Sequence, residues 1–255
     1  MVAMFKSPFD YGYICAATLI LHIHAWYQKL ENNNAFKMAV ICCAFGIITC
    51  GCRTVWVGVL FSVICYNMWS FRLGRNMTFG IVAVYFFILL YIFIPTVEEK
   101  VNSVTDIFEE NSETGGSSIA MRSTQFAMTL YYVEGDELFG KGKGYFTSEI
   151  WNPDVDESQR AETGLEGMES VIFGYILERG FFGLTLWITF NLIVFIYFRR
   201  HKQKKKMLTG LGASILTLYL VFSVGTGELG SVYPTMLLLG IVIKAVESSK
   251  TIRRT

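Results

Sequence analysis

The most constraining feature of this sequence is a series of seven apolar runs separated by polar segments of alternating charge. The runs are Tyr11–Tyr27, Phe36–Cys52, Val55–Phe71, Met77–Pro95, Phe181–Phe198, Met207–Val224 and Leu229–Val246. A helix needs roughly 20 apolar residues to cross the hydrocarbon core of a bilayer, and about 17 is the short end of the range. Backbone groups in lipid must be hydrogen-bonded within the protein, so we predict that each run is a helix. With 53% hydrophobic and 17% charged residues, the chain is predicted to be an all-α polytopic membrane protein.

The charges between the runs predict the topology. Basic residues gather in alternate connections, which contain only Glu31 and Glu247 of the 21 acidic residues. By the positive-inside rule these connections are cytoplasmic. The basic residues are Lys29, Lys37, Arg72, Arg75, Arg199, Arg200, Lys202, Lys204, Lys205, Lys206, Lys250, Arg253 and Arg254. The segments predicted to lie outside are the N-terminus, Gly51–Thr54, Thr96–Ser170 and Gly225–Gly230.

The long outer segment, Thr96–Ser170, is where we expect the chemistry. Within it, Ser117 and Ser118 are suitable caps for a helix over Ile119–Val133. Ile119, Arg122, Phe126 and Val133 fit one face of that helix. The helix either lies along the membrane surface or packs on the bundle.

Three further parts of the outer region have distinct compositions. Residues 135–144 are rich in glycine and predict a turn-rich loop. Thr96–Gly116 and Asn152–Glu166 are acidic and are expected to be mobile. Glu169–Gly180 is predicted to be a short helix at the outer rim that leads into the span at Phe181.

Two arginines are candidates for binding an anion. Arg53 lies at the outer end of a span, where it either holds a phosphate or glycan head group or marks a helix end by snorkelling. Arg122 lies among apolar neighbours, and its guanidinium either clamps an anionic donor through paired hydrogen bonds or anchors the helix at the membrane surface.

Lysines and acids of the outer region are weaker candidates. Lys141 and Lys143 belong to LFGKGKG, which resembles a phosphate loop only loosely because it lacks the Lys-Ser/Thr ending, so a structural turn is favoured. Glu169 or Glu178 at the rim either acts as a general base on a sugar hydroxyl or pairs with a nearby arginine. No residues have metal-ligand spacing, so neither a metal nor a cofactor is expected, and binding of nucleic acid is not expected either.

Taken together, three stretches resemble the superfamily of O-antigen ligases and O-antigen polymerases of the Wzy type. TCGCRTVWVGVL resembles its corner with an arginine after small residues. SSIAMRSTQFAMTLYYVEGDELFGKGKGYF resembles its stretch of an arginine followed by a glycine-rich Leu-Phe-Gly motif. ESVIFGYILERGFFGL resembles the stretch that opens the next span. The resemblance covers Phe36 to Val224 and implies a glycosyltransferase with a GT-C-like helical fold in the bacterial inner membrane.

The resemblance also implies the reaction. The donor is an oligosaccharide on undecaprenyl diphosphate, and the outer segment is the periplasmic loop of the family. Arg122 and Glu169 are implied as catalytic residues, and Arg53, Lys141 and Lys143 as substrate-binding residues. Membrane lipids, a chain-length regulator and a flippase are the further partners.

Within the superfamily, a polymerase of O-antigen or capsular repeat units is favoured. The histidine common in ligases is Glu169 here, and the asparagine after it is Ser170. A ligase that transfers glycan to lipid A-core, a transporter of lipid-linked glycan and an inactive fragment remain alternatives.

The same features predict the organisation of the chain. Residues 1–95 hold the first four spans, residues 96–170 the periplasmic loop with short helices, and residues 171–255 the last three spans and a cytoplasmic tail. The family has more spans than seven, and the first ten residues form no signal peptide although the N-terminus is predicted outside. We therefore expect a short form or the C-terminal portion of a longer protein.

Overall fold

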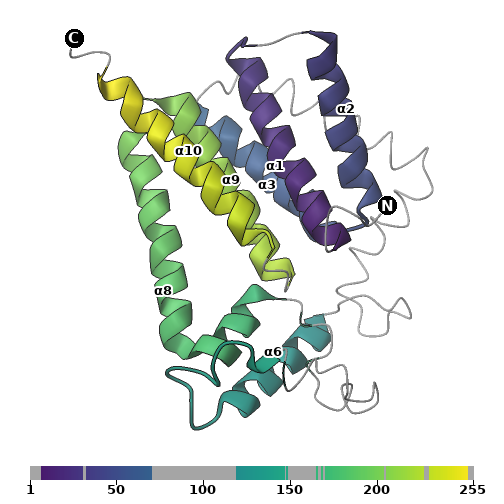
Figure 1. Cartoon of the computed structure of the whole chain (residues 1–255), viewed down its shortest axis with the longest axis vertical. Coiled ribbons are helices and arrows are strands. Elements are labelled where there is room, and N and C mark those ends of the chain that lie inside the picture. Colours follow the sequence, from purple (N-terminus) through teal and green to yellow (C-terminus); the bar gives the residue numbers. More distant parts are fainter. Residues whose placement is uncertain are drawn as a thin grey trace. The chain divides into compact units, whose positions relative to one another are not determined.

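The computed structural model of the chain describes residues 7–30, 33–70, 119–146, 148, 165, 168, 170–203, 205–226 and 230–251. In these residues the regular elements are seven helices, so the predicted all-α class is confirmed there (Figure 1). The helices are α1 (Pro8–Tyr27), α2 (Asn34–Thr49), α3 (Arg53–Ser70), α6 (Ile119–Val133), α8 (Val171–His201), α9 (Lys206–Gly225) and α10 (Val232–Thr251). The predicted span Met77–Pro95, the acidic segment Thr96–Gly116 and Glu169 lie outside the described residues, as does Asn152–Glu166 apart from Leu165.

Polar caps set where the first helices begin. The Ser7 hydroxyl accepts a hydrogen bond from the Asp10 N–H at 3.2 Å, and Pro8 occupies the first turn, where its missing N–H costs nothing. Asn33 likewise accepts from the Phe36 N–H at 2.8 Å at the start of α2. The helices therefore begin two or three residues before the apolar runs that predicted them.

Two of the described helices, α8 and α9, are long and apolar enough to cross a membrane. The 16 residues of α2 are apolar but shorter. The described residues of the runs that predicted α1 and α3 are also helical, and α10 begins at Val232 within its run.

The chain divides into two compact units. The first comprises Met1–Phe93, Ile193–Phe222 and Leu229–Thr255, and the second comprises Ile94–Leu192 and Ser223–Glu228. The residues of α8 up to Leu192 therefore belong to the second unit.

Glycines bring the helices of the first unit into close contact. A Cβ added at Gly12 of α1 would lie 2.6 Å from the Cys50 Sγ, and one added at Gly58 of α3 would lie 2.9 Å from Leu218 of α9. Small residues of this kind allow helix backbones to approach closely where the hydrophobic effect between helices is weak, as in lipid. The packing of this unit is thus of the kind that a membrane bundle requires.

The second unit has a small apolar core around two buried leucines, Leu165 and, in α8, Leu177. Partly buried hydrophobic side chains pack against these two residues, namely those of Met128, Tyr132, Tyr145, Phe146 and Met168. The core joins α6 to the first part of α8.

The helix predicted over Ile119–Val133 is confirmed as α6. Val133 is buried, whereas Phe126 is 42% exposed and contacts Phe173 of α8, with ring centroids 5.8 Å apart. The face of α6 that includes Val133 also buries Gln125 and Thr129. The Thr129 hydroxyl is satisfied within the helix, where it donates to the Gln125 carbonyl at 2.7 Å.

Candidate functional site

Carbonyl groups at the C-terminal end of α9 accept hydrogen bonds from two parts of the chain that are distant in sequence. The Arg122 Nη2 donates to the Gly225 carbonyl at 3.3 Å, and the Val171 N–H donates to the Thr226 carbonyl at 3.1 Å. The last carbonyls of a helix lack partners within it and carry partial negative charge. A cation and an N–H group are therefore favourable partners at this position. We call Arg122, Ser170, Ser223, Gly225 and Thr226 the α9-end cluster.

Ser170 connects the start of α8 to the same cluster. Its hydroxyl accepts from the Ile172 N–H at 3.3 Å, as a helix cap does, and lies 3.4 Å from the Ser223 carbonyl, to which it donates. Ser170, Ser223 and Thr226 are all buried. Glu169, the predicted base, precedes this anchored residue directly in the chain. The structure thus holds the neighbour of Glu169 and the side chain of Arg122 at one helix end.

The glycine-rich loop is hydrogen-bonded to a break in α8. At Gly180 the backbone leaves the helical conformation, with φ 63° and ψ −171°, and α8 turns (Figure 1). The predicted short helix before the span is therefore confirmed as the part of α8 that precedes Gly180. A break of this kind leaves carbonyls before it and N–H groups after it without helical partners.

The loop supplies partners on both sides of the break. The N–H groups of Lys141 and Gly142 donate to the carbonyls of Leu177 and Glu178, at 2.9 and 3.1 Å. In return, the N–H groups of Phe181 and Phe182 donate to the carbonyls of Glu137 and Leu138, at 2.8 and 3.0 Å. These hydrogen bonds give the glycine-rich loop a structural role, because they satisfy backbone groups of α8 on both sides of the break at Gly180.

The contact between loop and helix requires glycine on both sides. A Cβ at Gly140, whose φ is 72°, would lie 2.6 Å from the backbone nitrogens of Arg179 and Gly180. A Cβ at Gly180 would collide with the Leu138 carbonyl and lie 2.6 Å from the Glu137 oxygen. The spacing of these glycines therefore reflects backbone-to-backbone packing.

Gly180→Ala is expected to destabilise the protein strongly. The conformation at Gly180 is essentially restricted to glycine and costs other residues about 1–3 kcal/mol before any collision is counted. We expect a lower melting temperature and less folded protein in mild detergent, measured by thermal unfolding and size-exclusion chromatography. Gly240→Ala is the matched control, because a Cβ at Gly240 of α10 meets nothing within 4 Å. Equal melting temperatures for Gly180→Ala and the parent chain would contradict the interlocked arrangement.

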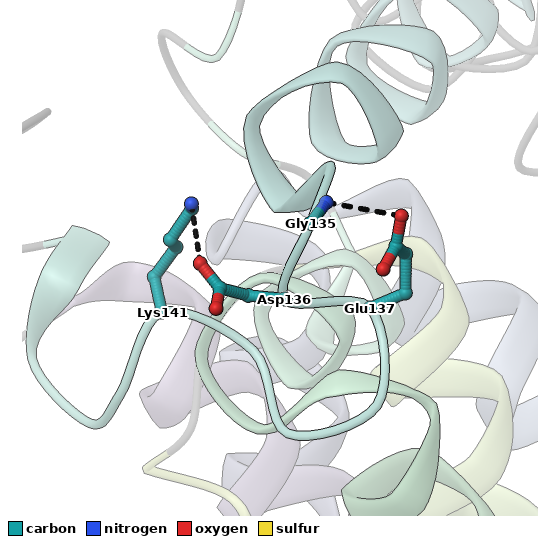
Figure 2. A network of polar contacts seen from close by, with 4 residues as sticks. All are labelled: Gly135, Asp136, Glu137 and Lys141. Carbon is teal, nitrogen blue, oxygen red and sulfur yellow. Dashed lines mark hydrogen bonds and ion pairs between the residues drawn. The ribbon is translucent and has the colours of Figure 1, made fainter.

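Polar side chains reinforce the same loop, as Figure 2 shows. The Lys141 ammonium lies 2.6 Å from the Asp136 carboxylate, which raises the pKa of Lys141. The Gly135 N–H donates to the Glu137 carboxylate at 3.0 Å, which lowers the pKa of Glu137. Lys141 and Glu137 are therefore charged at neutral pH.

The remaining predicted site residues lie in different surroundings. Glu178, the alternative acid, accepts a hydrogen bond from the Gly144 N–H at 2.9 Å. Lys143 is exposed at the tip of the glycine loop. Arg53 is half-buried and is the first residue of α3, which belongs to the other compact unit. No cluster of three or more His, Cys, Asp or Glu residues suited to a metal lies in the described part of the chain.

Sequence reasoning missed Ser170, Gly225 and Thr226 as members of the site. A serine directly before an apolar helical run is a recognisable cap signal, and it could have identified Ser170 as the start of α8. Gly225 and Thr226 contribute only backbone carbonyls, for which the sequence has no residue-type signal.

In the part of the chain that the structure describes, the regular elements are helices, and two of them are long and apolar enough to cross a bilayer. The chain belongs to the O-antigen ligase family, whose model matches residues 38–188, more than half of its 255 residues. Members of this family are membrane O-antigen ligases and polymerases, and their substrates are lipid-linked glycans. The comparison with curated proteins gives no match.

The family match contains all five predicted catalytic and substrate-binding residues. Arg53, Arg122, Lys141, Lys143 and Glu169 all fall within residues 38–188. The match begins in α2 and ends in α8, so α9, which supplies the backbone carbonyls of the α9-end cluster, lies beyond it.

Proposed function

We propose that this protein is a glycosyltransferase that polymerises undecaprenyl-diphosphate-linked repeat units of an O-antigen or capsule on the periplasmic face of the inner membrane. The observation that carries the proposal is the α9-end cluster. It brings the Arg122 guanidinium to the same helix end as Ser170, the residue after Glu169. The transfer needs a cation for the departing diphosphate, for which Arg122 is proposed, and a base for the acceptor hydroxyl, for which Glu169 is proposed.

The chemistry of the transfer is simple in outline. The acceptor hydroxyl oxygen forms a bond to the anomeric carbon of the donor as the bond from that carbon to the diphosphate breaks. The hydroxyl proton passes to a base, for which Glu169 is proposed. Negative charge develops on the departing undecaprenyl diphosphate, and the Arg122 guanidinium is proposed to stabilise it.

Arg122 suits this role for a second reason. A guanidinium carries five N–H donors in a planar fork, so a bond to the Gly225 carbonyl fixes its orientation and is compatible with holding a diphosphate. Lys141 and Lys143 are proposed to contribute positive charge to binding of the lipid diphosphate, and Arg53, in the other compact unit, is proposed separately as a substrate-binding residue. The contribution of Lys141 is secondary, since it already pairs with Asp136.

The proposal is tested with the purified full chain in proteoliposomes that contain undecaprenyl-diphosphate-linked repeat units. A ladder of lengthening glycans is expected on a gel. Transfer to added lipid A-core, without a ladder, would instead support the ligase alternative. If neither product forms with folded protein, glycosyl transfer by this chain is contradicted.

The proposed topology places residues 96–170 in the periplasm and the connection after α8 in the cytoplasm. This topology is proposed because basic residues are concentrated in alternate connections between the apolar runs, including Arg199 and Arg200 in the last turn of α8. A membrane-impermeant maleimide added to intact cells is expected to label Asp156→Cys and not Gln203→Cys, measured against the parent chain, whose six cysteines set the background. Labelling of Gln203→Cys from outside would overturn the arrangement.

A further inference from the structure

The glycine loop exposes large apolar side chains next to those at the start of the apolar part of α8. Leu138 and Phe139 are 59% and 66% exposed, and Phe181 and Phe182 are 42% and 50% exposed. The rings of Phe139 and Phe182 lie with their centroids 5.8 Å apart. We call these four residues the loop ridge. Apolar side chains gathered in this way indicate a surface that contacts something other than water.

The loop ridge is continuous with the exposed apolar side of a membrane-spanning helix. Beyond Phe182, α8 exposes further large apolar side chains, namely Leu186, Ile188, Phe190 and Leu192. In a membrane protein such a helix surface is covered by acyl chains. The backbone bonds from Phe181 and Phe182 to Glu137 and Leu138 attach the loop at the level where this surface begins.

Part of the loop backbone is hydrogen-bonded within the protein, as irregular backbone at membrane depth must be. The N–H of Gly140 donates to the Asp136 carbonyl at 2.7 Å, and those of Lys141 and Gly142 donate to α8. The carbonyls of Glu137 and Leu138 accept from α8. These bonds reduce the number of polar backbone groups that the segment with Leu138 and Phe139 brings to the acyl chains.

The charges of the loop limit how deep it goes. Asp136 pairs with Lys141, and the Glu137 carboxylate accepts from the Gly135 N–H. These groups, with exposed Lys143, are costly at the bilayer centre but tolerated near the head groups. The apolar side chains and the charges thus define a segment at the boundary between acyl chains and head groups.

We propose that Leu138 and Phe139 insert into the acyl chains of the leaflet in which the apolar span of α8 begins, and so anchor the glycine loop to the bilayer. The partner is membrane phospholipid. The anchor is independent of glycosyl transfer, because it rests only on exposure, backbone bonding and continuity with α8. Phe139 and Phe182 form its apolar contact, and Lys141 and Lys143 remain at the head groups.

The first test measures the depth of a nitroxide spin label in proteoliposomes of phosphatidylethanolamine and phosphatidylglycerol. The label is placed at Phe139→Cys, and at Lys143→Cys as the control on the same loop, in a full chain whose own cysteines are replaced. At Phe139→Cys we expect collisions with oxygen to exceed those with a water-soluble nickel complex several-fold, and at Lys143→Cys the reverse. Equal access of the nickel complex to both positions would overturn the anchor, and so would shielding of Phe139→Cys from both reagents, which indicates a protein cover.

The second test keeps the native cysteines. A photo-reactive phenylalanine analogue at position 139 of the full chain is irradiated in membranes, and the peptide is analysed by mass spectrometry. Adducts with the mass of phospholipid are expected. Adducts with peptides of this chain, of a second copy or of another protein, or with undecaprenyl lipid in place of phospholipid, would contradict the proposal.

Discussion

Glu169→Gln is expected to reduce polymer formation per molecule by about 10²–10⁴-fold, the usual contribution of a general base. Glutamine keeps the size and hydrogen-bonding capacity of the side chain but cannot take the proton of the acceptor hydroxyl. Ser170, the next residue, is held by the end of α9 and caps α8, so the substitution leaves those anchoring bonds in place. Activity is measured in membranes with lipid-linked repeat units and divided by the amount of folded protein.

Glu178→Gln is the matched control for this experiment. The Glu178 carboxylate accepts a hydrogen bond from the Gly144 N–H, and a glutamine oxygen at that position accepts the same bond. Its activity is therefore expected to stay close to that of the parent. If Glu169→Gln remains within about threefold of the parent, Glu169 does not have the 10²-fold effect of a base and is better described as the partner of an arginine.

Arg122→Ala is expected to lower polymer formation by about 10²–10³-fold, the effect of removing a donor to developing negative charge. Arg122→Lys keeps the positive charge but lacks the planar fork, so it is expected to lose most of the product, though less than the alanine variant. The glycan ladder is compared at equal amounts of folded protein, because both variants also lose the bond from the Arg122 Nη2 to the Gly225 carbonyl.

Arg179 provides the control for charge alone. It is exposed in the same unit, and its guanidinium lies 5.1 Å from the centroid of the Tyr175 ring. Arg179→Lys and Arg179→Ala are expected to retain the full range of chain lengths. The same full range in Arg122→Ala would reduce Arg122 to a residue that stabilises the end of α9.

The apolar runs predicted the described helices because a span must satisfy its backbone internally, whatever its partners. The errors at helix ends have local causes: Ser7 and Asn33 extend α1 and α2 toward the N-terminus through capping bonds outside the apolar runs. The sequence did not predict which side of α6 is buried: Gln125 and Thr129 are buried, whereas Phe126 is exposed. In a membrane protein an apolar face can point outward, so amphipathicity alone does not identify the inner side.

The candidate site was predictable in its residue types and not in its contacts. An arginine and an acid in the outer segment follow from the chemistry of a diphosphate leaving group. Arg122, Ser170 and Val171 instead bond to carbonyls of Ser223, Gly225 and Thr226, which any residue type supplies. Similarly, the glycines of LFGKGKG predicted a turn, but their hydrogen bonds to residues 177–182 depend on a helix break elsewhere in the chain. Arg53, Arg122, Lys141, Lys143 and Glu169 remain predictions as substrate or catalytic residues.

The bonds across the break at Gly180 have a consequence for biosynthesis. The loop of residues 135–144 leaves the ribosome before its partners at 177–182, and it has no way to complete its hydrogen bonds until those partners have followed. During translation the loop therefore lacks these partners until residues 177–182 have also left the ribosome. Formation of the loop is coupled to folding of the helix that follows it, and a ribosome stalled before Leu177 leaves the loop without the partners that shape it.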